Sequence, residues 1–81
     1  SPSTSLWQTL FVSGGRKDKI SKGDLVGFFI KKGLLGADQL GVIEIKHNCA
    51  FIGVQAPDIE ALIQRTTNLY LKKRKVRISL A

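Results

Sequence analysis

The sequence predicts an α+β domain in which four antiparallel strands form a sheet and two helices cover one of its faces. Short runs with apolar residues at every second position recur in the first, middle and last parts of the chain, which is the period of a strand. Two stretches between them carry apolar residues at helical spacing. Turn-forming residues separate these runs. The resulting order, β-α-β-β-α-β, is that of the ferredoxin-like sandwich.

One domain, residues 6–81, is expected to account for nearly the whole chain. A length of 81 residues supports a single hydrophobic core, and 43% hydrophobic with 23% charged residues is a globular composition. Residues 1–5 are serine, threonine and proline and are interpreted as a linker. Because the chain lacks an initiating Met and a secretory signal, we expect Ser1 to be a processed end or a cut inside a longer protein. No apolar run approaches the roughly 20 residues that cross a bilayer, so no membrane association is expected, and the single Cys49 fits a cytoplasmic location.

The start of the chain predicts a strand and a basic loop. In residues 6–12, Leu10 and Val12 point inward while Phe11 points outward. Two glycines then permit a sharp exit from the strand. Residues 16–19 follow as a loop rich in cations.

Residues 22–32 are predicted to form the first helix. Ser21 and Asp24 have the spacing of a capping box at its start. Gly27 lies inside the helix at a local cost, and we expect it to allow close packing on the sheet. The buried stripe would consist of Leu25, Phe28 and Phe29.

The middle of the chain predicts a hairpin followed by the second helix. Residues 34–41 connect the first helix to a strand over residues 42–46, and a turn at residues 47–48 leads into a strand over residues 49–54. Pro57 suits the first turn of the second helix. That helix is expected to end near Asn68 and to bury Ile59, Leu62, Ile63 and Thr66.

The last strand is expected over residues 72–80. It opens with four consecutive cations and then alternates, so that Val76, Ile78 and Leu80 face the core and the residues between them face solvent. A free cationic tail has no reason to keep apolar residues at every second position. The stretch is therefore interpreted as one half-buried strand with a basic outer face.

Two aromatic rings are expected on the sheet face that the helices leave open. Alternation places Phe11 and Phe51 there, and exposed rings gain about 1–3 kcal/mol when an RNA base stacks on them. Residues 10–12 and 48–54 resemble the first- and third-strand consensus of the RNA-recognition motif, with Cys49 in place of one ring. Alternatively, the rings cap a small core or an interface with the rest of the parent protein.

The charge of the chain points to a polyanionic partner. Thirteen Lys and Arg against six Asp and Glu give a net charge of +7, which favours RNA or DNA and, less specifically, anionic membrane. The cations gather in the loop after the first strand and in the last strand, although the loop alone is equally compatible with a solvated surface. Together with the two rings, the predicted RNA contacts are Phe11, Arg16, Lys17, Lys19, Lys46, Phe51, Lys72, Lys73, Arg74, Lys75 and Arg77.

No catalytic machinery is predicted for these residues. The chain shows no acid and base pair and no nucleophile with a partner, and Gly14-Gly15 lacks the Lys-Ser/Thr of a phosphate-binding loop. Cys49 and His47 are too few for a closed zinc site. We therefore expect a binding domain without enzymatic activity, cofactor or metal.

A sharper resemblance comes from several segments taken in order. Gly14-Gly15-Arg16-Lys17-Asp18-Lys19 is followed by Gly23-Asp24-Leu25-Val26-Gly27, by Gly36-Ala37-Asp38 with Leu40-Gly41-Val42-Ile43, and finally by Arg74-Lys75-Val76-Arg77-Ile78. Over residues 6–80 the chain resembles the C-terminal RNA-binding domain of bacterial DEAD-box RNA helicases of the DbpA type. It departs from that pattern at Lys72-Lys73, where a glycine commonly precedes the basic strand, and at Cys49.

This resemblance implies an RNA-recognition-motif-like fold that tethers an ATP-dependent helicase core, carried in the same chain, to structured RNA. In the best-known branch of the family that RNA is a hairpin of large-subunit ribosomal RNA, which implies a role in ribosome assembly.

Two function classes remain open. The first is an RNA-binding module that serves a helicase, and the second is a protein-interaction domain of the same fold, whose exposed rings meet another protein. The basic strand beside the basic loop favours the first, because the core of a protein interface is depleted in charge, especially in Lys. In either case we expect a monomer.

Overall fold

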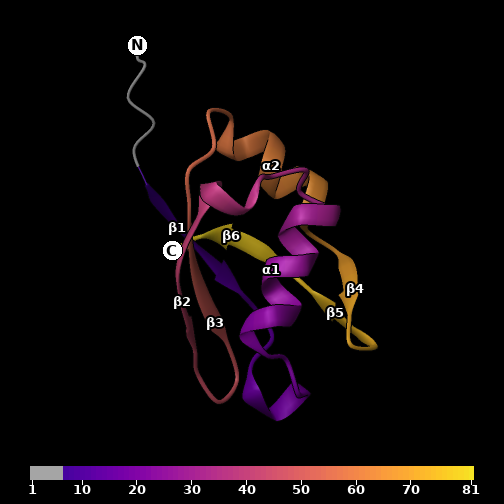
Figure 1. Cartoon of the computed structure of the whole chain (residues 1–81). Helices are drawn as coiled ribbons and strands as arrows, with labels where there is room; N and C mark the ends of the chain where they lie inside the picture. Colours follow the sequence, from indigo (N-terminus) through magenta and orange to yellow (C-terminus); the bar gives the residue numbers. More distant parts are fainter. Residues whose placement is uncertain (1–6) are drawn as a thin grey trace.

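The computed structural model describes residues 7–81 (Figure 1). The predicted linker at residues 1–5 and the expected strand position Leu6 lie outside the described residues. In chain order the elements are β1 (Gln8–Val12), the 3₁₀ helix η1 (Arg16–Asp18), α1 (Lys22–Lys31), the 3₁₀ helix η2 (Ala37–Gln39), β2 (Leu40–Ile45), β3 (Ala50–Val54), α2 (Ile59–Thr66), β4 (Leu69–Leu71), β5 (Arg74–Val76) and β6 (Ile78–Leu80).

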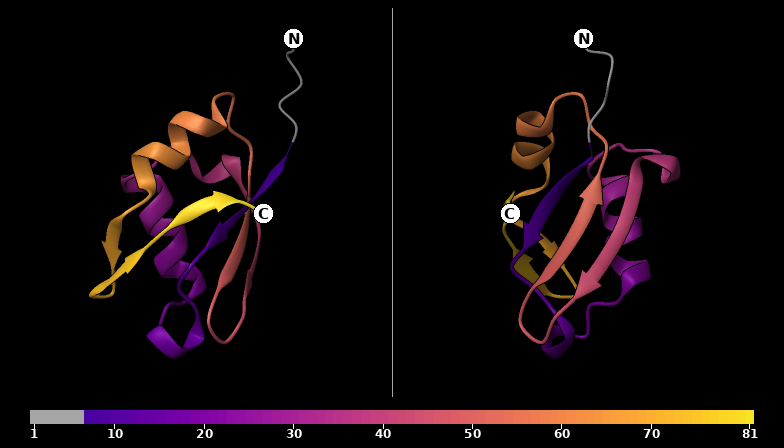
Figure 2. Two further views of the ribbon diagram at one scale, coloured as in Figure 1. Left: turned by 180° about the vertical axis from the view of Figure 1, so that it is seen from behind. Right: turned by 90° about the vertical axis from the view of Figure 1, so that its left-hand side faces the viewer.

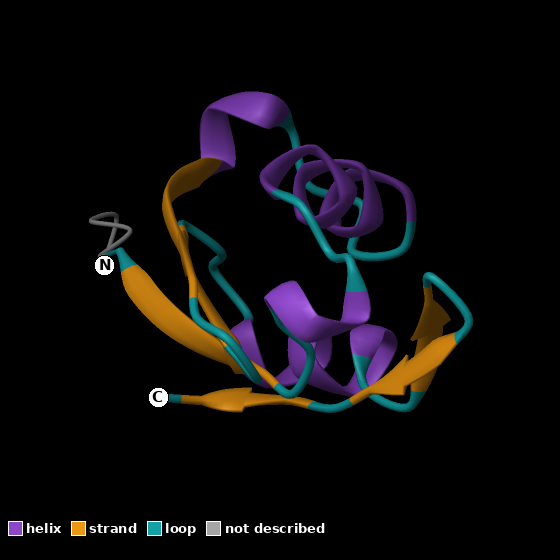
Figure 3. Ribbon diagram, turned by 90° about the horizontal axis from the view of Figure 1, so that it is seen from below, coloured by secondary structure: helices purple, strands orange, loops and turns teal. Residues whose placement is uncertain are grey.

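Within residues 7–81, a four-stranded antiparallel sheet with the strand order β2-β3-β1-β6 forms one layer, and β4 with β5 forms a separate two-stranded sheet. Both helices lie on the same face of the four-stranded sheet (Figures 2 and 3). The predicted α+β ferredoxin-like fold is thereby confirmed. The opposite sheet face, with β1 and β3 at its centre, is left open.

The hydrophobic core lies between the four-stranded sheet and the helices. Leu10 and Val12 of β1 are fully buried, as predicted. Leu25 and Phe29 of α1 and Leu62 of α2 close the core from the other side and are also buried. Each such side chain gains about 1.5–3 kcal/mol on burial. Because side chains alternate between the two faces of a strand, burial of one set places the other set on the open face.

Helix α1 begins where the sequence predicts and ends one residue earlier. The Asp24 carboxylate accepts hydrogen bonds from the Ser21 N–H at 2.9 Å and from its hydroxyl at 3.0 Å, and the Ser21 hydroxyl accepts from the Asp24 N–H at 3.3 Å. This is the expected capping box.

The expectation for Gly27 is wrong, because a Cβ placed there would meet nothing within 4 Å. Close packing on the sheet therefore does not require a glycine at this position.

Helix α2 is shorter than the sequence suggests. The Asp58 carboxylate accepts a hydrogen bond from the Ala61 N–H at 3.1 Å and caps the helix start. Pro57 therefore lies before the cap, which corrects its expected place in the first turn. The helix ends at Thr66, whose buried hydroxyl donates to the Leu62 carbonyl at 2.7 Å.

Strand β2 begins at Leu40, two residues before its predicted start, and contains a β-bulge. Gly41 and Val42 of β2 together oppose the single residue Gly53 of β3. The bulge turns two consecutive residues toward solvent, and Val42 is 83% exposed. At the other end the strand stops at Ile45, so Lys46 belongs to the turn.

The basic C-terminal stretch forms a hairpin and an edge strand, and the prediction of one continuous strand is wrong. β4 pairs with β5 across Lys72 and Lys73, and β6 then pairs with β1. The two lysines have φ values of 55° and 64°, the sign that a two-residue type I′ hairpin turn requires. Val76 and Ile78 are buried as predicted, whereas Leu80 is 49% exposed because β6 lies at the sheet edge.

Candidate nucleic-acid interface

The basic loop after β1 is fixed against the β2–β3 hairpin. The Arg16 N–H donates to the Lys46 carbonyl at 2.9 Å, and the Lys17 N–H makes the equivalent bond one residue further along the turn. Gly15 permits this approach, because a Cβ there would lie 2.5 Å from the Cys49 nitrogen. Its φ of −143° is extended, so close contact explains this glycine better than conformational freedom does.

Two ion pairs attach the β4–β5 hairpin to the rest of the domain. Arg74 Nε lies 3.3 Å from Asp18 Oδ2 in η1, and Lys72 Nζ lies 3.7 Å from Asp24 Oδ1 in α1. Both cations are half-exposed, so neither ion pair adds much to stability. Their main effect is to position the hairpin beside η1.

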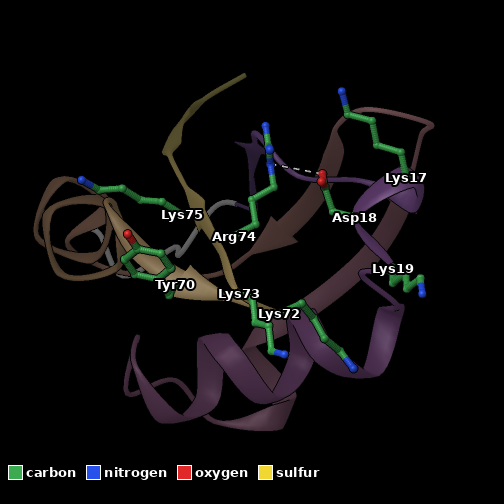
Figure 4. A pocket seen from close by; sticks show the side chains of 8 residues that line it. All are labelled: Lys17, Asp18, Lys19, Tyr70, Lys72, Lys73, Arg74 and Lys75. Atoms are coloured by element: carbon green, nitrogen blue, oxygen red, sulfur yellow. Dashed lines mark ion pairs between the residues drawn. The ribbon is translucent and has the colours of Figure 1, made fainter.

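A hollow of about 550 Å³, here called the basic groove, lies between η1 and the β4–β5 hairpin (Figure 4). Figure 4 shows Arg74 turned toward Asp18, whereas the lysines extend away from this pair in several directions. Within the described residues, Asp18 and Asp24 pair with only two of the six groove cations. The groove therefore keeps a positive field that attracts phosphate groups. The described residues that line it are Lys17, Asp18, Lys19, Tyr70, Lys72, Lys73, Arg74 and Lys75.

Three lysines of the basic groove adopt a backbone conformation that disfavours any residue with a Cβ. Lys19, Lys72 and Lys73 have φ values between 55° and 64°, and the left-handed region costs about 1–2 kcal/mol per residue. Within residues 7–81 only Leu34 and Asn68 share a positive φ, and no glycine does. Glycine would avoid the cost at each position. From lysine at three strained positions around one groove we infer that the charge there serves a function.

The attachment of the hairpin to α1 is insensitive to pH near neutrality. The hydrogen bond from the Ser21 N–H is the main cause that lowers the pKa of Asp24, opposed by some desolvation and reinforced by the Ser21 hydroxyl and the Lys72 ammonium. Asp24 is therefore ionised well below pH 7, and its ion pair with Lys72 is present throughout the physiological range.

The open face of the four-stranded sheet carries both predicted rings. Phe11 and Phe51 are direct partners in the β1–β3 register, with centroids 5.7 Å apart and ring planes at 66°. Both remain partly exposed. Beside Phe51 on β2 lies Glu44, whose carboxylate is 3.3 Å from Lys46 Nζ. A base that stacks on this ring pair would therefore lie beside an ion pair, with the Glu44 carboxylate next to Phe51.

The predicted contact residues lie in four places: the basic groove, the open sheet face, the β2–β3 hairpin and the link between β5 and β6. The Arg16 guanidinium donates to the Ile45 carbonyl at 3.2 Å, so it lies against the β2–β3 hairpin with Lys46 and does not line the groove. Arg77 is exposed between β5 and β6, and its N–H donates to the Ser13 hydroxyl at 2.8 Å. The predicted residues in the groove are Lys17, Lys19, Lys72, Lys73, Arg74 and Lys75, and those on the sheet face are Phe11 and Phe51.

Two exposed aromatic side chains are absent from the predicted contacts. Tyr70 is 69% exposed and lines the basic groove. Its signal was present in Leu69-Tyr70-Leu71, which alternates as a strand with the tyrosine outward. Trp7 is 52% exposed and lies beside the open face of the sheet, where it contacts Gly41.

The fold and the basic groove define a small nucleic-acid-binding domain, a ferredoxin-like sheet with an open aromatic face and a cationic groove beside it. Residues 9–80 match the DbpA RNA binding domain family. The chain belongs to this family, which confirms the resemblance found in the sequence, and its partner is RNA. No curated protein matches the chain.

Among residues 7–81 no cluster of His, Cys, Asp and Glu suits a metal ion, and no helix of this part has the length and apolarity to cross a bilayer.

Proposed function

We propose that this domain tethers the core of a DEAD-box, ATP-dependent RNA helicase to structured RNA, with ribosomal RNA as the target and cytoplasmic ribosome assembly as the setting. The domain acts as a monomeric binding unit, and ATP hydrolysis belongs to the helicase core of the same natural protein. Family membership supports the RNA partner. The resemblance to the C-terminal domains of DbpA-type helicases supports the tethering role.

The observation that carries the proposal is the basic groove with its strained lysines. Its cations come from two segments far apart in the sequence, which ion pairs hold side by side. A groove of this kind suits the sugar-phosphate backbone of a folded RNA, because phosphate contacts position a protein without reading sequence. In this mode the groove supplies most of the affinity. Phe51 and Phe11 add the stacking of a base on the neighbouring sheet face.

The expected salt dependence follows from the number of phosphate contacts. About four to six of the thirteen cations can reach phosphates at once, and each displaces roughly 0.7–0.9 counterions. The logarithm of the association constant should therefore fall with the logarithm of salt concentration with a slope of about −3 to −5. If the domain bound RNA only by base stacking, or bound another protein and not RNA, the salt slope would be near zero.

A charge-matched pair of variants tests the groove. Lys19→Gln with Lys75→Gln removes two groove cations that form no ion pair within residues 7–81. Lys32→Gln with Arg65→Gln removes two cations of the helical layer outside the groove. The first pair should reduce the magnitude of the salt slope by about 1.4–1.8, and the second should leave it nearly unchanged. Equal losses from both pairs would indicate diffuse attraction and contradict the groove as the binding site.

The tethering role is tested on the natural full-length protein. Deletion of this domain should raise the concentration of a ribosomal RNA fragment that half-saturates ATP hydrolysis, while the maximal hydrolysis rate stays similar. A natural protein without ATP-binding and DEAD motifs before Ser1 would refute this part of the proposal and leave the RNA-binding groove untouched.

A further inference from the structure

The open sheet face carries an apolar site at the end away from the turn that joins β2 and β3. A shallow hollow of about 380 Å³ is present beside Trp7, and no charged residue of the described chain lines it. Its rim consists of the Trp7 indole, 52% exposed, and the Val42 side chain, 83% exposed. We refer to it as the Trp7 ledge; its lining residues are Trp7, Thr9, Gly41, Val42 and Gly53.

The β-bulge of β2 builds the Trp7 ledge. Gly41 lies directly against the indole, where an added Cβ would be 3.0 Å from Cζ3 and 3.2 Å from Cε3 of Trp7. Opposite the bulge, Gly53 leaves room for a side chain, since an added Cβ there would be in ordinary van der Waals contact with the Val42 backbone at 3.7 Å. The bulge and the two glycines thus support one flat ring and keep the adjacent surface empty. Bulges commonly occur where a protein redirects side chains for binding.

The size of the Trp7 ledge favours a single planar group over a protein surface. Stable protein interfaces use about 20–30 residues on each side, whereas five residues form this site. The RNA partner of the domain supplies planar groups, and base–aromatic stacking tolerates any base because every base has a π-face. Trp7 precedes Phe11 by four residues of extended chain, or about 13 Å. One base cannot contact both rings, so the ledge is a separate subsite.

We propose that the Trp7 ledge binds one unpaired nucleobase that extends from the structured RNA, by stacking of the base on the indole. Trp7 and Gly41 provide the stacking surface, and Val42 covers the edge of the base. The proposal rests on the RNA binding proposed above and adds a recognition element, namely the junction between a paired region and an unpaired strand. Trp7 lies outside the residues 9–80 that match the family.

The test compares two RNA probes. One is a blunt RNA hairpin, and the other is the same hairpin with a short unpaired extension at its 5′ or 3′ end. Because the chain has a single Trp, tryptophan fluorescence, excited at a wavelength that Tyr70 does not absorb, reports on the ledge alone. We expect the extended hairpin to quench this fluorescence and to bind at least about fivefold more tightly than the blunt one, the lower limit for one base–aromatic stack.

Four variants make the test specific. Trp7→Ala and Gly53→Val, which fills the hollow, should abolish the advantage of the extended hairpin while blunt-hairpin binding stays unchanged. Trp7→Phe should retain most of the advantage of the extended hairpin. Leu34→Ala should retain all of this advantage, because it shortens an exposed apolar side chain outside the ledge. Circular dichroism confirms the fold of each variant.

Four outcomes would overturn the proposal. If both hairpins bind the wild type equally, or if Trp7→Ala keeps the advantage of the extension, the ledge does not accept a base and is better explained as a protein contact. If Trp7→Ala weakens both hairpins equally, Trp7 has only a structural role. If neither hairpin binds at any salt concentration, the RNA-binding function fails together with the ledge.

Discussion

The turn at the tip of the β4–β5 hairpin allows the charge and the strain of one lysine to be separated. Lys73 has a φ of 64° and forms no ion pair within the described residues, whereas Lys72 pairs with Asp24. Two substitutions remove the same charge from this position. Lys73→Gly also removes the strain of the left-handed conformation, because glycine has no Cβ. Lys73→Ala keeps the Cβ and therefore the strain.

The two variants should differ in stability by a calculable amount. The left-handed region costs a residue with a Cβ about 1–2 kcal/mol, and glycine loses about 0.5–1 kcal/mol of that gain through the larger entropy of its unfolded state. From the midpoints of the two ranges, Lys73→Gly should therefore be more stable than Lys73→Ala by about 0.75 kcal/mol. For a domain of this size the difference corresponds to about 3–6 °C in Tm, which thermal unfolding resolves.

RNA binding should distinguish the variants from the wild type but not from each other. Each loses one phosphate contact, so the magnitude of the salt slope should fall by about 0.7–0.9 and affinity at 0.1 M salt by about five- to eightfold. If Lys73→Gly is no more stable than Lys73→Ala, the turn imposes no strain. If both bind RNA like the wild type, the inference from strain to function is wrong.

Three further predictions concern the helix, the sheet face and pH. Gly27→Ala should raise the free energy of unfolding by about 0.5–1 kcal/mol in urea titrations, because its Cβ meets nothing within 4 Å; a decrease would mean that α1 packs more tightly there than the structure shows. Phe51→Ala should cost about 1–3 kcal/mol of RNA affinity with an unchanged salt slope, since it removes a ring and no cation; normal binding would exclude stacking at that position. The lowered pKa of Asp24 means that its stabilising contribution is complete above the ordinary carboxyl pKa of about 4 and is lost as the pH falls below it. Between pH 5 and pH 2, unfolding experiments on Asp24→Asn should show a smaller loss of stability than those on the wild type, and parallel curves would contradict this assignment.

Local sequence chemistry determined the main elements of this domain. The capping box at Ser21 and Asp24 is a short-range motif, and helix α1 begins there as predicted. Alternation along β1 put Leu10 and Val12 in the core and Phe11 on the open face, because a strand allows only two directions for its side chains. The fold class and the family follow from such signals taken in order.

Tertiary structure decided the parts that depend on distant partners. Alternation in the last ten residues does not reveal whether they pair with β1 alone or first fold back on β4, and two lysines give no sign of the positive φ that makes the hairpin. The bulge that exposes Val42 depends on its partner strand β3.

The composition of the basic groove is likewise a result of pairing across the fold. Arg16 adjoins Lys17 in the sequence, yet a hydrogen bond to the Ile45 carbonyl directs its guanidinium elsewhere. Tyr70 joins Lys17 in the groove because the β4–β5 hairpin lies beside η1. Sequence patterns specify the face on which a side chain lies, but the set of neighbours that makes a binding site requires contacts between segments that only the folded chain brings together.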